Sequence, residues 1–151
     1  MGNGAGAIGR TCATELRVRY AETDAMSVVY YANYFVWFEV GRGEWIRQFG
    51  LTYREFEEQG VYLPVVRAAC DYKASARYDD LIRLETTVTN LTPVRIAFAY
   101  RVTRLDAAPG QATPPPPAVL AEGRTEHAFV GADGRLTRLD RHQLWQVLSN
   151  E

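Results

Sequence analysis

One helix-forming segment, residues 33–49, constrains the fold most, because its first half is apolar on nearly every side. No charged residue occurs in it before Glu39. Apolar residues and one glycine recur at spacings of three and four, namely Tyr34, Trp37, Phe38, Gly41, Trp45 and Phe49. We expect the helix to begin near Asn33 and to end at Gly50. So wide an apolar surface must be covered on most sides by other parts of the protein.

Period-two patterns, which are typical of β-strands, dominate the rest of the chain. A first strand, with Leu16, Val18 and Tyr20 on one face, precedes the helix, and a short second helix is expected near residues 53–59. Four longer strands follow. In each, alternate residues form a one-sided set, meaning residues that share one face of the strand: Val66, Ala68, Cys70 and Tyr72; Ile82, Leu84, Thr86 and Val88; Ile96, Phe98, Tyr100 and Val102; and Ala121, Gly123, Thr125, His127 and Phe129. This order predicts an α+β fold in which a curved antiparallel sheet wraps the long central helix.

The chain of 151 residues has the length of one ordinary domain. We expect a flexible tail over residues 1–12 and a single domain over residues 13–151. A Pro-rich connection near residues 107–118 is predicted to be exposed and unrelated to chemistry, and a closing helix is predicted near residues 140–148. A single sheet leaves an edge open, so we expect a homodimer or homotetramer.

The charges nearly cancel, with 17 Lys and Arg against 18 Asp and Glu. No field therefore exists to attract nucleic acid or an anionic membrane. The uncharged run of residues 25–38 is shorter than the roughly 20 apolar residues of a membrane span, and the first ten residues lack the features of a secretory signal. The two cysteines and two histidines have no metal-ligand spacing. We expect a cytoplasmic protein without metal or cofactor.

Residues 17–42 form the one stretch that indicates chemistry. A strand ending in Tyr20 is followed by Asp24 and by the pattern V-V-Y-x-x-N-Y at residues 28–34, which runs into the aromatic helix. This stretch resembles the 4-hydroxybenzoyl-CoA thioesterase family and its YbgC-like relatives. The resemblance implies a hotdog fold, hydrolysis of an acyl-coenzyme A thioester, Asp24 as the catalytic carboxylate, and pockets at subunit boundaries.

The chemistry of a thioester fits these residues. Its carbonyl is attacked readily, so one carboxylate and one donor to the developing oxyanion can suffice. Asp24 can act as nucleophile or as general base, and the backbone N–H near Tyr31, at the start of the helix, can bind the oxyanion. Tyr30 and Tyr34 are expected in the pocket wall. Lys73 and Arg77 can meet the phosphates of coenzyme A, and His127 is expected to be a buried, hydrogen-bonded histidine.

Several alternatives remain open from the sequence. An Asp after a strand is often only the acceptor of an Asx turn or a helix cap. Ser27 stands where the family usually has Gly, and Tyr31 stands where YbgC-like members carry His. A hotdog dehydratase would need a histidine on or near the helix, which has none. A non-catalytic module that binds acyl-CoA or acyl carrier protein is the main alternative function, and an acyl-carrier thioester is an alternative substrate.

Overall fold

The computed structural model describes residues 6–108, 110 and 114–150. Its elements in chain order are β1 (Thr11–Arg17), the 3-10 helix η1 (Tyr20–Glu22), α1 (Asn33–Gln48), α2 (Tyr53–Glu58), β2 (Val65–Tyr72), β3 (Leu81–Leu91), β4 (Arg95–Asp106), β5 (Ala118–Ala128), the 3-10 helix η2 (Leu139–Arg141) and α3 (Gln143–Ser149). Among the helices of these residues, none has the length and apolar character that crossing a membrane requires.

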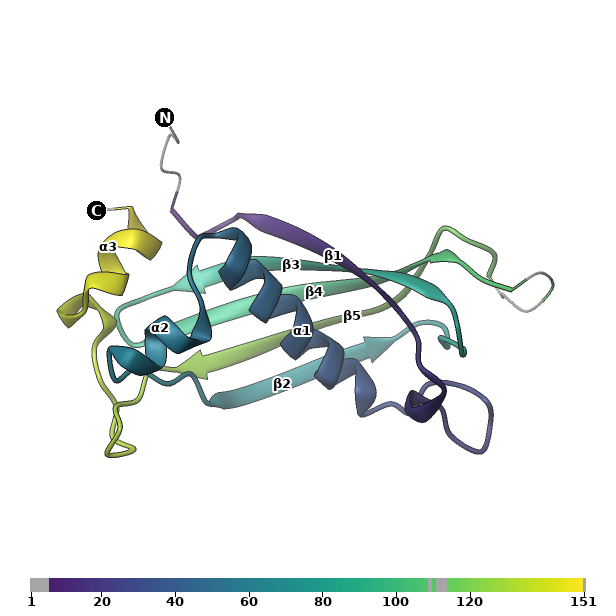
Figure 1. Cartoon of the computed structure of the whole chain (residues 1–151), viewed down its shortest axis with the longest axis horizontal. Helices are drawn as coiled ribbons and strands as arrows, with labels where there is room; N and C mark the ends of the chain where they lie inside the picture. The colour runs from purple at the N-terminus through teal and green to yellow at the C-terminus, as the bar shows by residue number, and fades with distance from the viewer. Residues whose placement is uncertain (1–5, 109, 111–113, 151) are drawn as a thin grey trace.

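The strands form one five-stranded sheet in the order β1-β3-β4-β5-β2, with every neighbouring pair antiparallel. Helix α1 lies diagonally across one face of this sheet (Figure 1). The predicted α+β arrangement, a long helix against a curved antiparallel sheet, is therefore confirmed.

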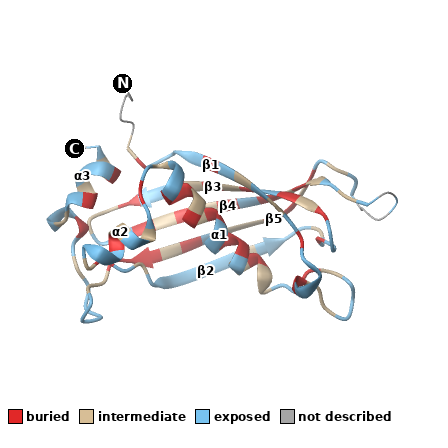
Figure 2. Cartoon of the chain, in the orientation of Figure 1, coloured by how far each residue is buried: buried red, intermediate tan, exposed pale blue. Residues whose placement is uncertain are grey.

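The core lies between α1 and the central strands, where the red segments of Figure 2 gather. Trp37, Phe38 and Trp45 of α1 are at most 1% exposed. The predicted one-sided sets of β3 and β4 are all buried, and Phe38 stacks on Tyr100 of β4 with 4.3 Å between ring centroids. Aromatic rings bury large apolar areas, so this contact fixes the helix on the sheet.

Two glycines allow this close approach. A Cβ added to Gly41 of α1 would overlap Thr86 Oγ1 on β3, and one added to Gly123 of β5 would lie 2.5 Å from the Phe38 ring. Gly43 is different, because its added Cβ would find only ordinary contacts at 3.8 Å. The helix therefore approaches the sheet closely at Gly41 and not at Gly43.

The N-terminal segment differs from the expected tail. Ala7 is fully buried and donates its N–H to Leu148 O at 2.7 Å, and Gly9 N–H donates to Val88 O at 2.7 Å. From residue 6 onward the segment thus packs on the domain, while residues 1–5 lie outside the described part. The first strand also ends earlier than its pattern predicts, since Tyr20 falls in η1 and is 77% exposed.

One side of the molecule remains uncovered. Strand β2 is a sheet edge, and all its residues except Cys70 are exposed. Val36 and Val40, on the apolar front half of α1, are 46% and 41% exposed. Residues 6–108, 110 and 114–150 therefore do not provide all of the covering that the sequence predicts for this helix.

The two glycines of α1 give a matched test of the close contact. Gly41→Ala should destabilise the fold by about 1–3 kcal/mol, because overpacking against Thr86 outweighs the gain in helix propensity. Gly43→Ala has room for its methyl group and should leave stability unchanged or raise it by up to about 1 kcal/mol. Urea unfolding of both variants measures the difference, and equal effects would contradict the packing described here.

Candidate active site

Asp24 lies in the loop of residues 23–32, between η1 and α1. Its N–H donates to Val28 O at 2.9 Å, its carbonyl accepts from Ser27 N–H at 2.9 Å, and its Oδ1 accepts from Met26 N–H at 2.8 Å. The Asx-turn alternative is thus present in the structure. Oδ2 has no partner among the described residues, so half of the carboxylate remains available for chemistry.

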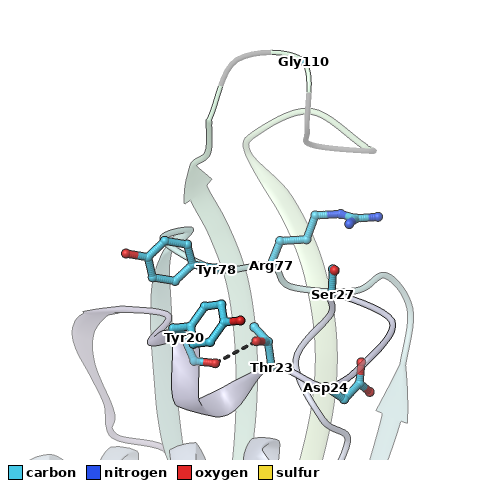
Figure 3. A pocket seen from close by; sticks show the side chains of 7 residues that line it. All are labelled: Tyr20, Thr23, Asp24, Ser27, Arg77, Tyr78 and Gly110. Carbon is cyan, nitrogen blue, oxygen red and sulfur yellow. Dashed lines mark hydrogen bonds between the residues drawn. The ribbon is translucent and has the colours of Figure 1, made fainter.

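Ser27 keeps the backbone conformation that a glycine would favour. Its φ is 64°, in the left-handed region, where a residue with a side chain is strained by of order 1 kcal/mol. Serine in place of the usual glycine therefore does not abolish the turn around Asp24. Figure 3 shows the Ser27 and Asp24 side chains on one loop, with Arg77 extending above Ser27.

Helix α1 begins at Asn33, and the preceding residue, Ala32, is its N-cap. The Asn33 side chain does not cap the helix but donates to Glu22 O at 2.8 Å. The N–H groups of residues 33–35 donate to the carbonyls of residues 30–32. The N–H groups of Tyr31 and Ala32 have no acceptor among the described residues. Two adjacent amide donors therefore stand free just before the helix.

Two cavities meet at Asp24. The first, of about 360 Å³, is lined by Asp24, Val28, Val29, Tyr30, Tyr31, Tyr34, Tyr72, Lys73, Ala74 and Ser75. The second, of about 560 Å³, is lined by Tyr20, Thr23, Asp24, Ser27, Arg77, Tyr78 and Gly110 (Figure 3). The six residues that the sequence singles out are thus gathered around Asp24, five in the first cavity and Arg77 in the second.

Tyrosine side chains form the wall of the first cavity. The Tyr34 and Tyr72 rings meet edge to face at 5.0 Å, and Tyr72 Oη donates to Tyr31 O at 2.9 Å. Burial raises the pKa of the Tyr34 and Tyr72 phenols, and a hydrogen bond with Tyr31 raises the pKa of Tyr30. These three phenols therefore stay protonated near neutral pH, and Asp24 is the better candidate for a base in this cavity.

A buried ion pair supports the segment that carries Lys73 and Arg77. Arg104 of β4 is fully buried, and its Nε donates to Asp80 Oδ2 at 3.0 Å. Its other nitrogens donate to Ser75 O and, at 2.9 Å, to Pro114 O. The same Asp80 oxygen accepts from Arg77 N–H at 2.9 Å. The segment is thereby fixed against the sheet, while the exposed side chains of Lys73 and Arg77 reach the cavities.

His127 lies in the core and lines neither cavity. Its Nδ1 lies 3.0 Å from Leu63 O, and its Nε2 lies 2.8 Å from Thr125 Oγ1, which in turn bonds Tyr100 Oη at 2.6 Å. The prediction of a buried, hydrogen-bonded histidine is confirmed. Burial lowers the pKa of His127 from 6.5 to about 4.

Sequence reasoning missed several residues of the site. In the sequence, Tyr72 is one of several alternating residues on a strand face, and no pattern among its neighbours indicates its contact with Tyr31. The Pro-rich connection was expected to be unrelated to chemistry, yet Gly110 lines the larger cavity and Pro114 O binds Arg104. Residues 109 and 111–113 of that connection lie outside the described part. Tyr20 and Tyr78, whose rings meet edge to face at 5.9 Å, also line this cavity.

The chain is similar to known proteins in sequence. The profile of the thioesterase-like superfamily matches residues 18–146. YneP of Bacillus subtilis is 39% identical over 88 residues, 58% of this chain and 64% of that protein. The acyl-CoA thioesterase YbgC of Haemophilus influenzae is 39% identical over 90 residues, 59% of this chain and 66% of that protein. These alignments therefore span slightly less than two thirds of either relative.

A solved structure extends the match over nearly the whole chain. The DHNA-CoA thioesterase of Staphylococcus aureus superposes with a TM-score of 0.82 and 30% sequence identity. The superposition covers 93% of this chain and 89% of that protein. The likeness therefore extends over most of the fold.

The lowered pKa of His127 predicts acid sensitivity of the fold. The unfolded chain binds a proton below about pH 6.5, whereas the folded chain does so only near pH 4. Stability is therefore complete above pH 6.5 and falls as the pH drops, by about 2 kcal/mol between pH 7 and pH 5. His127→Gln does not titrate and should lose less stability over that interval. Urea unfolding at both pH values checks this, and an equal loss in both proteins would contradict it.

Proposed function

The chain belongs to the thioesterase-like superfamily, and from this membership we propose that it hydrolyses an acyl-coenzyme A to a free acid and coenzyme A. One observation carries the proposal: the Asp24 carboxylate and the unpaired N–H of Tyr31 belong to residues that line the same cavity. A carboxylate for the attack and a free amide donor for the developing oxyanion can suffice for thioester hydrolysis. The named activities of YbgC and the Staphylococcus aureus enzyme support the same class of substrate.

In the proposed mechanism, the thioester oxygen accepts a hydrogen bond from Tyr31 N–H, with Ala32 N–H beside it. This donor stabilises the negative charge that develops on the oxygen during attack. Asp24 either attacks the carbonyl carbon, forming an anhydride that water then opens, or removes a proton from an attacking water. In the direct route, water forms the new C–O bond as the C–S bond breaks. In the anhydride route, Asp24 forms a C–O bond as the C–S bond breaks, and water then forms a second C–O bond as the anhydride C–O bond breaks and the Asp24 carboxylate is regenerated. Either route consumes one water, which supplies the oxygen of the free acid and the proton of the coenzyme A thiol.

The two cavities suggest how the substrate lies. We place the acyl group in the smaller cavity, against Tyr30 and Tyr34, because its wall is aromatic. The coenzyme A portion then leaves past Asp24, and its phosphates meet the exposed cationic groups of Lys73 and Arg77. A phosphopantetheine thioester on an acyl carrier protein presents the same reacting bond and is the second substrate to test.

We also propose that the working form is a homodimer or a dimer-based tetramer, as the uncovered side of the fold suggests. Edge strand β2 offers unpaired backbone groups for a second copy. Val65 and Val66 on this strand are 47% and 49% exposed, similar to Val36 and Val40 on α1. Pairing of two copies would cover these side chains and bring a second chain close to the cavities at the start of α1.

Asp24→Asn tests the enzymatic proposal. The amide keeps the shape of the side chain and its Oδ1 acceptor but loses the charge, so kcat should fall by about 10³-fold or more while acyl-CoA binding persists. Tyr31→Phe is the control, since it removes the phenol and keeps the backbone N–H, and kcat should stay within a few-fold. Thiol release from acetyl-, medium-chain, long-chain and aromatic acyl-CoAs measures both.

The same assay separates the enzyme from a binding module. A binder would raise the melting temperature with acyl-CoA without releasing thiol. Retention of most of kcat in folded Asp24→Asn would remove this residue from the mechanism, and inactivity of Tyr31→Phe would assign the phenol a chemical role.

Light scattering tests the assembly. The wild-type chain should show at least twice the monomer mass of 17.0 kDa. Val36→Asp combined with Val40→Asp places two charges on the surface proposed to be covered, so it should shift the protein toward the monomer. Val147→Asp, on the equally exposed Val147 of α3, is the control and should leave the mass unchanged. A fully active wild-type monomer would contradict the proposal.

A further inference from the structure

Glu22 is a buried carboxylate that the proposed mechanism does not use. The residue is 5% exposed and lies at the end of η1, two positions before Asp24. Its Oε2 accepts from Trp37 Nε1 at 2.7 Å, and its Oε1 accepts from Arg19 N–H at 2.8 Å. Burying a carboxylate is costly, and here both oxygens are satisfied by directed donors from separate elements.

The main chain of Glu22 holds the far end of the Asp24 loop. Its carbonyl oxygen accepts from Tyr30 N–H at 2.9 Å and from Asn33 Nδ2 at 2.8 Å. These two residues stand on either side of Tyr31 and Ala32, the pair whose N–H groups are free. The orientation of both free amides is therefore limited by bonds to a single residue.

A second connection runs from Glu22 through side chains around the smaller cavity. Trp37, held by the carboxylate, packs on Tyr34 with 4.9 Å between ring centroids. Tyr34 meets Tyr72, and Tyr72 Oη donates to Tyr31 O at 2.9 Å. The contacts thus begin beside Asp24, pass along the cavity wall and end on the peptide of Tyr31.

We propose that Glu22 is a positioning residue, which fixes the Asp24 carboxylate and the Tyr31 N–H relative to each other through its bonds to Trp37, Tyr30 and Asn33. The inference rests on the function proposed above and adds a residue to the same site. An error of about 1 Å between two reacting groups can cost about 10²-fold in rate. A residue that holds two reacting groups in place therefore acts on kcat more than on substrate binding.

A carboxylate suits this task better than an amide. Trp37 Nε1 and Arg19 N are both donors, so the residue between them must accept on both of its oxygens. A glutamine would turn its NH2 group toward one of these donors, and that contact would be lost. Glu22→Gln therefore changes the hydrogen bonding while leaving the size of the side chain almost unaltered.

Thiol-release kinetics of Glu22→Gln test the proposal. We expect kcat to fall ten- to a hundredfold while KM stays within twofold. Trp37→Phe removes the indole donor and should give a similar fall, and the double variant should be no worse than the more impaired single variant, because both act through one contact. The indole N–H resonance of Trp37, identified by its absence in Trp37→Phe, should shift in Glu22→Gln.

Ile46→Val is the control for a general loss of stability. Ile46 is 2% exposed and lies in the last turns of α1, remote in sequence from the Asp24 loop. The variant should destabilise the protein and leave kcat unchanged. If Glu22→Gln does not fold, Trp37→Phe tests the role of Glu22 instead, again by a fall in kcat with KM within twofold.

The outcomes separate this proposal from the function on which it rests. Wild-type protein that releases no thiol from any acyl-CoA would overturn both. An active enzyme that Asp24→Asn inactivates, with wild-type kcat in folded Glu22→Gln or Trp37→Phe, would overturn the role of Glu22 alone. A fall in kcat for Ile46→Val equal to that of Glu22→Gln would show that lost stability, not lost positioning, is the cause.

Discussion

The contact between the aromatic face of α1 and the central strands is the interaction on which the rest of the structure depends. Phe38 lies flat on Tyr100, and two glycines, one on the helix and one on β5, remove the side chains that would keep the layers apart. Such close packing leaves little freedom in the position of the helix. The start of α1 is therefore fixed relative to the sheet, and with it the end of the Asp24 loop.

The candidate site forms at the rim of this core, where the packing becomes polar. There the buried charges are held by specific partners: Glu22 by the Trp37 indole, and Arg104 by Asp80. Replacement of one member of such a buried set leaves the other uncompensated, so each group depends on its partner. Glu22 orders the side of the cavities with Asp24 and Tyr31, and the Arg104–Asp80 pair orders the side with Lys73 and Arg77.

Apolar side chains along β2 and the first half of α1 remain exposed to solvent. A helix whose first half is apolar on nearly every side needs cover on more sides than one five-stranded sheet provides. The exposed valines of α1 and β2 show where that cover is missing. The tyrosine-walled cavity opens near this side of the molecule, so a second chain would complete both the packing and the surroundings of the site.

The sequence by itself determined the order and kind of the elements and the loop on which Asp24 lies. Helical spacing, strand alternation and turn residues are local patterns, and α1 and the strands follow from them. The loop with Asp24 was singled out by the resemblance of residues 17–42 to a known family. The tertiary structure decided which distant residues meet: Trp37 with Glu22, Tyr72 with the Tyr31 peptide, and Ala7 with Leu148. Such contacts join residues that are distant in the chain and depend on how helices and loops close over the core, which the spacing of neighbouring residues does not encode.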